Sequence, residues 1–160
     1  ILCLSAFAID ATKTIREPRV KVVETGDILI DKLYPSMTGP YERVPIDTSD
    51  LELITGFKTE VVDAGSGQKM GEEFFCHSQL QIAKLDRLIV GATGMANIQF
   101  PDGFGMPVRE IISQHEKSNE GLSLLGMVLN NHEADINRNV KIRTTINYWN
   151  NEDLSNLPNF

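Results

Sequence analysis

Cys76 and His77 are the adjacent residues of this sequence with the clearest chemical potential, and they lie within the run Glu73–Ser78. A thiolate beside an imidazole can serve as an activated nucleophile or can bind a soft metal ion. Adjacent side chains on a β-strand point to opposite faces, so the two groups can act together only where the strand bulges. On that ground the sequence favours a core Cys76 and a surface or interface His77.

His132 is the second histidine that the sequence singles out. It lies in an Asn-rich, acidic segment, Asn130–Asp135, whose oxygen atoms can hold a cation. Such a segment between two strands is more typical of a solvated turn. A copper site would combine His132 with His77, or with a methionine that the fold brings close, since one imidazole does not hold a catalytic copper. The methionines are scattered, at positions 37, 70, 95, 106 and 127, which favours core filling.

Motifs of common catalytic and nucleotide-binding sites are absent from the sequence. It contains no GxGxxG, GxxxxGK[ST] or GxSxG pattern, and its histidines and cysteines lack the spacing of a zinc site. The net charge of −7 repels phosphate backbones, so nucleic acid is not an expected partner. We therefore expect a protein that is not an enzyme and has no cofactor, with copper as the alternative.

Apolar residues between residues 19 and 149 recur with a period of two, which is typical of β-strands. The clearest strand is Asn139–Trp149, in which apolar and polar residues alternate. Two hairpins are expected, one joining Arg19–Glu24 to Asp27–Leu33 and one joining Phe57–Val62 to Glu72–Ile82. The remaining expected strands are Arg87–Ala92, Met95–Phe100, Met106–Ile112 and Leu122–Asn130. Roughly nine strands predict an all-β fold, a two-sheet antiparallel sandwich or jelly roll with an N-terminal apolar segment.

Residues 1–15 begin with an uncharged, apolar run that ends at Asp10. The run is shorter than the ~20 residues that span a bilayer. It is therefore either the outer end of a hydrophobic anchor or signal segment, or an ordinary buried strand or helix. Ala6-Phe7-Ala8 has the small-x-small form of a signal peptidase site, which favours the anchor or signal remnant. The expected contacts with a membrane or partner are Ile1, Leu2, Leu4, Phe7 and Ile9.

A chain of 160 residues predicts one domain with a sizeable core. We place this β-sandwich domain at residues 16–150, after the apolar segment and a polar link that contains Pro18. Residues 151–160 are polar and contain Pro158, and we expect them to form an irregular C-terminal tail.

Three stretches of the chain share a pattern with a known family: Glu73–Ser78, Phe100–Val108 and Val128–His132. They resemble the N-terminal jelly-roll domain of the copper type II, ascorbate-dependent monooxygenases, the family of peptidylglycine α-hydroxylating monooxygenase and dopamine β-monooxygenase. The resemblance implies a jelly roll with His132 as a copper ligand. The family's paired histidines have no counterpart in Gln79–Gln99, and only the first of its two copper-binding domains is matched. The resemblance therefore argues against the family's hydroxylation chemistry.

These features together predict a non-catalytic structural or accessory subunit outside the cytoplasm. We expect it to be membrane-associated, in the periplasm if the source is bacterial, and to dock on a larger membrane assembly such as a respiratory or photosynthetic complex. Its expected partners are the protein subunits of that complex, together with the membrane through the N-terminal segment. The alternative is a copper-binding protein related to monooxygenase jelly-roll domains.

Overall fold

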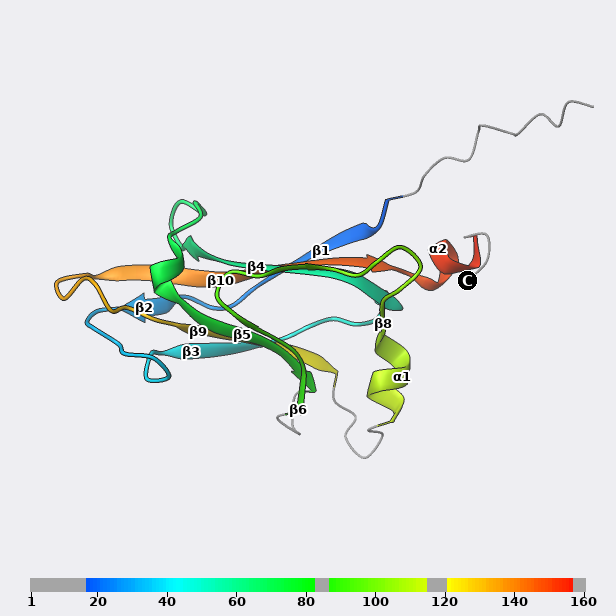
Figure 1. The fold of residues 1–160 in the computed structure, drawn as a ribbon, viewed down its shortest axis with the longest axis horizontal. Helices are drawn as coiled ribbons and strands as arrows, with labels where there is room; N and C mark the ends of the chain where they lie inside the picture. Colours follow the sequence, from blue (N-terminus) through cyan, green and yellow to red (C-terminus); the bar gives the residue numbers. More distant parts are fainter. Residues whose placement is uncertain (1–16, 83–86, 115–120, 157–160) are drawn as a thin grey trace, which may run out of the picture.

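The structure is a computed structural model of the chain, and it describes residues 17–82, 87–114 and 121–156. These residues form two antiparallel β-sheets that pack against each other, with only short helices at the periphery (Figure 1). The all-β sandwich that the period-two pattern predicts is confirmed. The apolar segment of residues 1–15, with its expected anchor residues, lies outside the described residues.

The first sheet has the strand order β1-β10-β4-β7. Two shorter strands, β2 and β8, also belong to it. Strand β2 pairs with β10 beyond the end of β1, and β8 pairs with β4 beyond the end of β7. The bounds are β1 Arg19–Glu24, β2 Ile28–Ile30, β4 Leu53–Asp63, β7 Asn97–Gln99, β8 Met106–Pro107 and β10 Arg138–Trp149. The long strands β4 and β10 therefore form the centre of this sheet.

The second sheet has the strand order β3-β9-β5-β6. Every neighbouring pair in it is antiparallel. The bounds are β3 Tyr41–Pro45, β5 Phe75–Ile82, β6 Arg87–Thr93 and β9 Leu122–Val128. The sequence pattern did not predict β3, which lies at the edge of this sheet and has mostly exposed residues.

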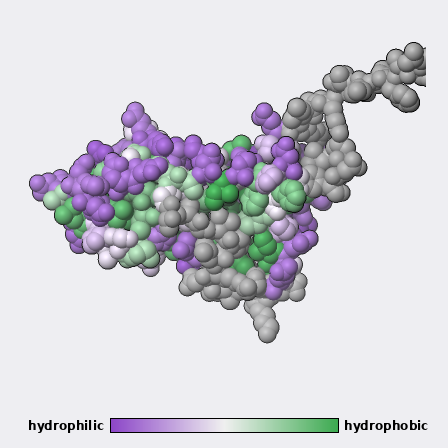
Figure 2. Space-filling view, in the orientation of Figure 1, coloured by the Kyte–Doolittle hydropathy of each residue, from purple (hydrophilic) through white to green (hydrophobic). Residues whose placement is uncertain are grey.

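The core lies between the two sheets, because alternate residues of each strand turn their side chains inward. In β10 the inward positions are Val140, Ile142, Thr144, Ile146 and Tyr148, all of them buried, as the alternation predicts. Gly126 of β9 lies against Ile142, so the sheets approach closely at that point. In Figure 2, hydrophilic side chains cover the upper sheet, and hydrophobic ones reach the surface mainly at the level between the sheets.

The expected hairpin of β1 with β2 is wrong, since these two strands do not pair with each other. Both pair with β10, β2 with residues 138–140 and β1 with residues 143–148. The reason lies at Thr25, whose N–H donates to the carbonyl of Ile142 at 3.0 Å and whose hydroxyl accepts the Ile142 N–H at 3.0 Å. These two bonds hold the connecting residues along β10, so the chain continues straight where a tight turn was expected.

The second expected hairpin is also wrong, because β4 belongs to the first sheet and β5 to the second. The predicted turn at Asp63–Gly67 does form, and it returns the chain far enough for a single bridge between Val62 and Lys69. The chain then crosses to the other sheet through a short 3-10 helix, Glu72–Phe74. The turn was therefore predicted, but the crossing of the chain from the first sheet to the second was not.

Two segments form short helices where the sequence analysis expected other structure. The strand expected at Met106–Ile112 is only two residues long, and the chain continues as helix α1, Val108–Ser113. The tail expected to be irregular contains helix α2, Asn151–Ser155, because the side chain of Asn150 accepts the Asp153 N–H at 2.8 Å and caps it. None of the helices in the described residues is long and apolar enough to cross a membrane.

Candidate functional site

Strand β5 bulges at Cys76. Phe75 lies opposite Val128 of β9, and His77 lies opposite the next residue of β9, Met127. Cys76 is therefore an extra residue on β5, and Cys76 and His77 together oppose the single residue Met127. A bulge is the condition under which the sequence analysis allowed the thiol and the imidazole to act together.

The bulge brings the two side chains into contact, with Cys76 Sγ 3.3 Å from His77 Nδ1. Cys76 is a free cysteine and is partly buried. His77 is only 7% exposed, so the expectation of a surface histidine is wrong. Burial lowers the pKa of His77, because desolvation disfavours its charged form. The pair therefore combines a thiol with an imidazole that is neutral near pH 7.

His132 lies at an exposed position of the turn between β9 and β10. Asn130 builds this turn, because its Oδ1 accepts the N–H groups of His132 at 3.2 Å and Glu133 at 3.1 Å. The predicted solvated turn is confirmed for residues 131–135, although Asn130 itself is fully buried. No hydrogen bond joins His132 to His77 in the part of the chain that the structure describes.

The described residues contain no group of three or more His, Cys, Asp or Glu side chains that could hold a metal ion. Core filling holds for three methionines: Met106 is buried in one apolar cluster, and Met70 and Met95 pack against the other. It is wrong for Met37, which is 67% exposed. Met127 is different, since it lies on β9 opposite the Cys76–His77 bulge. Sequence reasoning missed this position, because no local signal sets the register of His77 against Met127, about 50 residues away in the sequence.

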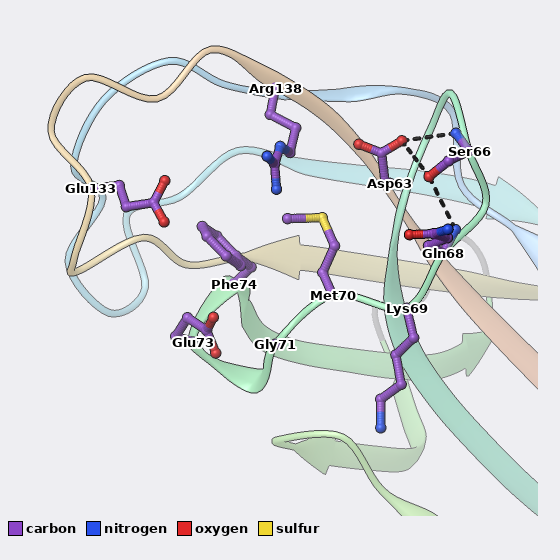
Figure 3. A pocket seen from close by; sticks show the side chains of 10 residues that line it. All are labelled: Asp63, Ser66, Gln68, Lys69, Met70, Gly71, Glu73, Phe74, Glu133 and Arg138. Atoms are coloured by element: carbon purple, nitrogen blue, oxygen red, sulfur yellow. Dashed lines mark hydrogen bonds between the residues drawn. The ribbon is translucent and has the colours of Figure 1, made fainter.

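A notch of about 390 Å³ opens at one end of the sandwich, between the β4–β5 crossover and the loop that leads into β10 (Figure 3). Phe74 and Met70 form its apolar part, and Arg138 points into it toward Met70, whereas Lys69 points away. Apart from Gly71, the remaining lining residues are polar or charged: Asp63, Ser66, Gln68, Glu73 and Glu133. Charges of both signs therefore meet in this notch.

Asp63 is the most constrained carboxylate of the notch. Its Oδ1 accepts the Ser66 N–H at 2.8 Å, the Ser66 hydroxyl at 2.9 Å and the Gly65 N–H at 3.1 Å. The hydrogen bonds from Ser66, together with the nearby positive charge of Arg138, lower the pKa of Asp63. The Asp63 carboxylate therefore stabilises the turn after β4 and is not a candidate acid or base for chemistry in the notch.

A second polar network joins β1 to β10. The Lys21 ammonium contacts Asp50 Oδ1, and the Tyr148 hydroxyl donates to Asp50 Oδ2 at 2.6 Å. Lys21 and then Tyr148 lower the pKa of Asp50, and the Asp50 carboxylate raises the pKa of Tyr148. The network uses Lys21 for an internal contact, since only 20% of its side chain is exposed.

Replacing Asp50 by asparagine should make the stability of the domain less sensitive to acid. The folded-state pKa of Asp50 is lowered, so its contribution is present above the ordinary value of 3.8 and is lost as the pH falls below that value. Urea unfolding at about pH 6 and about pH 3 measures this loss. Asp50→Asn should lower the free energy of unfolding at about pH 6. It should also reduce the difference between the free energies of unfolding at the two pH values. An unchanged difference would show that Asp50 is not stabilised in the folded state.

An apolar stripe runs along the free edge of the first sheet. Val20 and Val22 of β1 and Leu29 of β2 are 59%, 55% and 45% exposed. All three lie opposite outward-facing positions of β10, at Asn147, Thr145 and Asn139. Strands β1 and β2 have β10 as their only strand partner among the described residues. We call Val20, Val22 and Leu29 the edge stripe.

Comparisons with known proteins show no family for this chain. No family model matches the chain, and no curated protein matches it. A solved structure described as "Cyanophage Pam1 capsid asymmetric unit" is similar to it with a TM-score of 0.35 and 10% sequence identity. That similarity covers 92% of this chain and 93% of the other. A likeness of this level carries no argument about function.

Proposed function

We propose that this chain is a non-catalytic accessory subunit that joins a larger membrane-associated assembly outside the cytoplasm. The observation that carries the proposal is the edge stripe, a row of exposed aliphatic side chains along strands with a free side. The occupant we propose is an extended segment of a neighbouring protein subunit, which adds to the sheet beside β1.

Edge strands of soluble proteins are usually protected by lysine, proline or a bulge, because their free N–H and C=O groups pair readily with other chains. In β1 the lysine does not serve this purpose, since Lys21 reaches Asp50 on the inner side. The residues that flank it, Val20 and Val22, leave the outer side apolar. Such an edge suits β-augmentation, in which backbone hydrogen bonds supply affinity and alternate side chains supply contacts.

The energy available at the stripe supports attachment of moderate strength. About half of each of its three side chains remains to be buried, which corresponds to roughly 1 kcal/mol per residue. The apolar run Ile1–Ile9 precedes β1 in the sequence and supplies a second point of attachment to a membrane or partner. Two linked contacts bind more tightly than either one alone, because the second event becomes intramolecular.

Two lysine substitutions in the stripe provide the test. Val20→Lys with Val22→Lys should leave the sandwich folded, because both side chains point to solvent, and should release the protein from its assembly. Tagged variants are expressed in the native cells, and membranes are solubilised in mild detergent. The size of the complex is then read on a native gel, with its subunits identified by mass.

Tyr41→Lys is the matched control, because Tyr41 is 59% exposed on β3 at the edge of the other sheet. The wild type and this control should migrate in the large complex, and the double lysine variant should migrate as a free domain.

A chain that starts at Asp10 should lose membrane association and still unfold cooperatively. A wild-type protein found only as a free domain would refute the proposed function.

A further inference from the structure

We propose that Cys76, His77 and Met127 form a binding site for monovalent copper on the outer face of the second sheet. The site is independent of the docking edge, which lies on the first sheet. It also differs from the copper set expected from the sequence, because it uses Cys76 and Met127 with His77 and does not use the exposed His132.

The bulge creates the geometry of the site. Two ligand atoms of one tetrahedral ion, with bonds of about 2.0 Å to nitrogen and about 2.3 Å to sulfur, lie roughly 3.5 Å apart. Cys76 Sγ and His77 Nδ1 are 3.3 Å apart without any rearrangement. Met127 is the β9 residue that lies opposite this pair in the strand register. A regular strand would have turned Cys76 and His77 to opposite faces.

The donor set selects the ion. A thiolate and a thioether are soft ligands, and together with an imidazole they favour Cu(I) over hard cations such as Mg²⁺ and Ca²⁺. Binding uses the neutral form of the imidazole and the thiolate form of the cysteine. Binding replaces the S–H bond of Cys76 by an S–Cu bond and releases one proton to solvent. The copper enters and stays as Cu(I), so no electron is transferred.

A titration of the full chain with Cu(I) tests the site. It is done under anaerobic conditions in competition with a chromophoric Cu(I) chelator, in mild detergent. The wild type should bind one Cu(I) per chain. Cys76→Ser and His77→Gln should each weaken the affinity by at least about 100-fold, and Met127→Leu by about 10-fold, since even groups outside the ligand shell cost 10–100-fold.

Two matched variants separate this site from one that uses Cys3 or His132. Cys3→Ser removes the second thiol, and His132→Ala removes the exposed imidazole. Both should bind Cu(I) within about twofold of the wild type, because neither residue belongs to the proposed ligand set. Loss of binding in either variant would overturn the assignment of the ligands.

X-ray absorption of the copper-loaded protein supplies a direct readout. It should show sulfur and nitrogen at bonding distance in the wild type and lose a sulfur in Cys76→Ser. Cys76→Ser is nearly isosteric and partly exposed, so it keeps the test valid if His77→Gln does not fold. Equal Cu(I) affinity in the wild type and Cys76→Ser, or one-to-one binding of Zn²⁺ in preference to Cu(I), would refute the proposal.

Discussion

Asn130→Ala should lower the free energy of unfolding by about 2–4 kcal/mol. Asn130 is fully buried and hydrogen-bonds through both ends of its amide. Its Nδ2 donates to the carbonyls of Lys32 at 2.8 Å and Glu133 at 2.7 Å, and its Oδ1 accepts two N–H groups of its own turn. Alanine would leave the buried members of this set without partners and would leave a small cavity. Urea unfolding followed by circular dichroism measures the change.

His132→Ala is the control for this experiment, two residues away in the same turn. The imidazole is exposed, and the turn uses only the backbone N–H of that residue. Its free energy of unfolding should stay within about 0.5 kcal/mol of the wild type. Equal losses in the two variants would mean that the turn contributes through its exposed side chains, contrary to the hydrogen-bond pattern.

Gly126→Ala should lower the free energy of unfolding by about 1–3 kcal/mol. A Cβ atom at this position would lie 2.6 Å from Ile142 Cγ1 and 2.7 Å from Ile142 Cβ, closer than carbon atoms pack. Ile142 is fully buried in β10, so relief requires the two sheets to move apart. Thermal or urea unfolding of the variant measures the cost.

Gly65→Ala is the glycine control, because the nearest atom to its added Cβ is Asp63 Oδ1 at an ordinary 3.6 Å. Its stability should change by no more than about 0.5 kcal/mol. Ile142→Ala combined with Gly126→Ala should cost less than the sum of the two single changes, because alanine lacks Cγ1, the Ile142 atom nearest to the new methyl. Strict additivity of the pair would contradict the close packing of the sheets.

The sequence was sufficient for the sandwich and for the inner face of its longest strand, because β10 alternates strictly and each inward residue is buried. Strand pairing was not predictable. The Thr25-Gly26 dipeptide is typical of a tight turn, but long-range bonds from Thr25 to Ile142 override that preference. In the same way, the crossover after Asp63 forms because β5 pairs within the second sheet, and no local residue pattern predicts that pairing.

In the candidate sites, too, local features were predictable from the sequence and long-range contacts were not. The turn at residues 131–135 was predicted from its composition, whereas the burial of Asn130 was not, because the carbonyl of Lys32 that it binds comes from 98 residues away. The thiol and imidazole of Cys76 and His77 were recognised, but the bulge that joins them arises from pairing with β9. For Val20 and Val22, the sequence predicted the strand Arg19–Glu24 but not that both side chains would be exposed.

Hydrogen–deuterium exchange of the β1 amides tests the central claim most directly. The protein is compared in its assembly and after release as the Val20→Lys, Val22→Lys variant. Amides of β1 that do not donate to β10 should exchange rapidly in the released domain. If a partner strand adds to this edge, they should slow by at least about tenfold in the assembly, while those of edge strand β3 stay unchanged. Equal exchange of the β1 amides in both states would contradict docking through this edge.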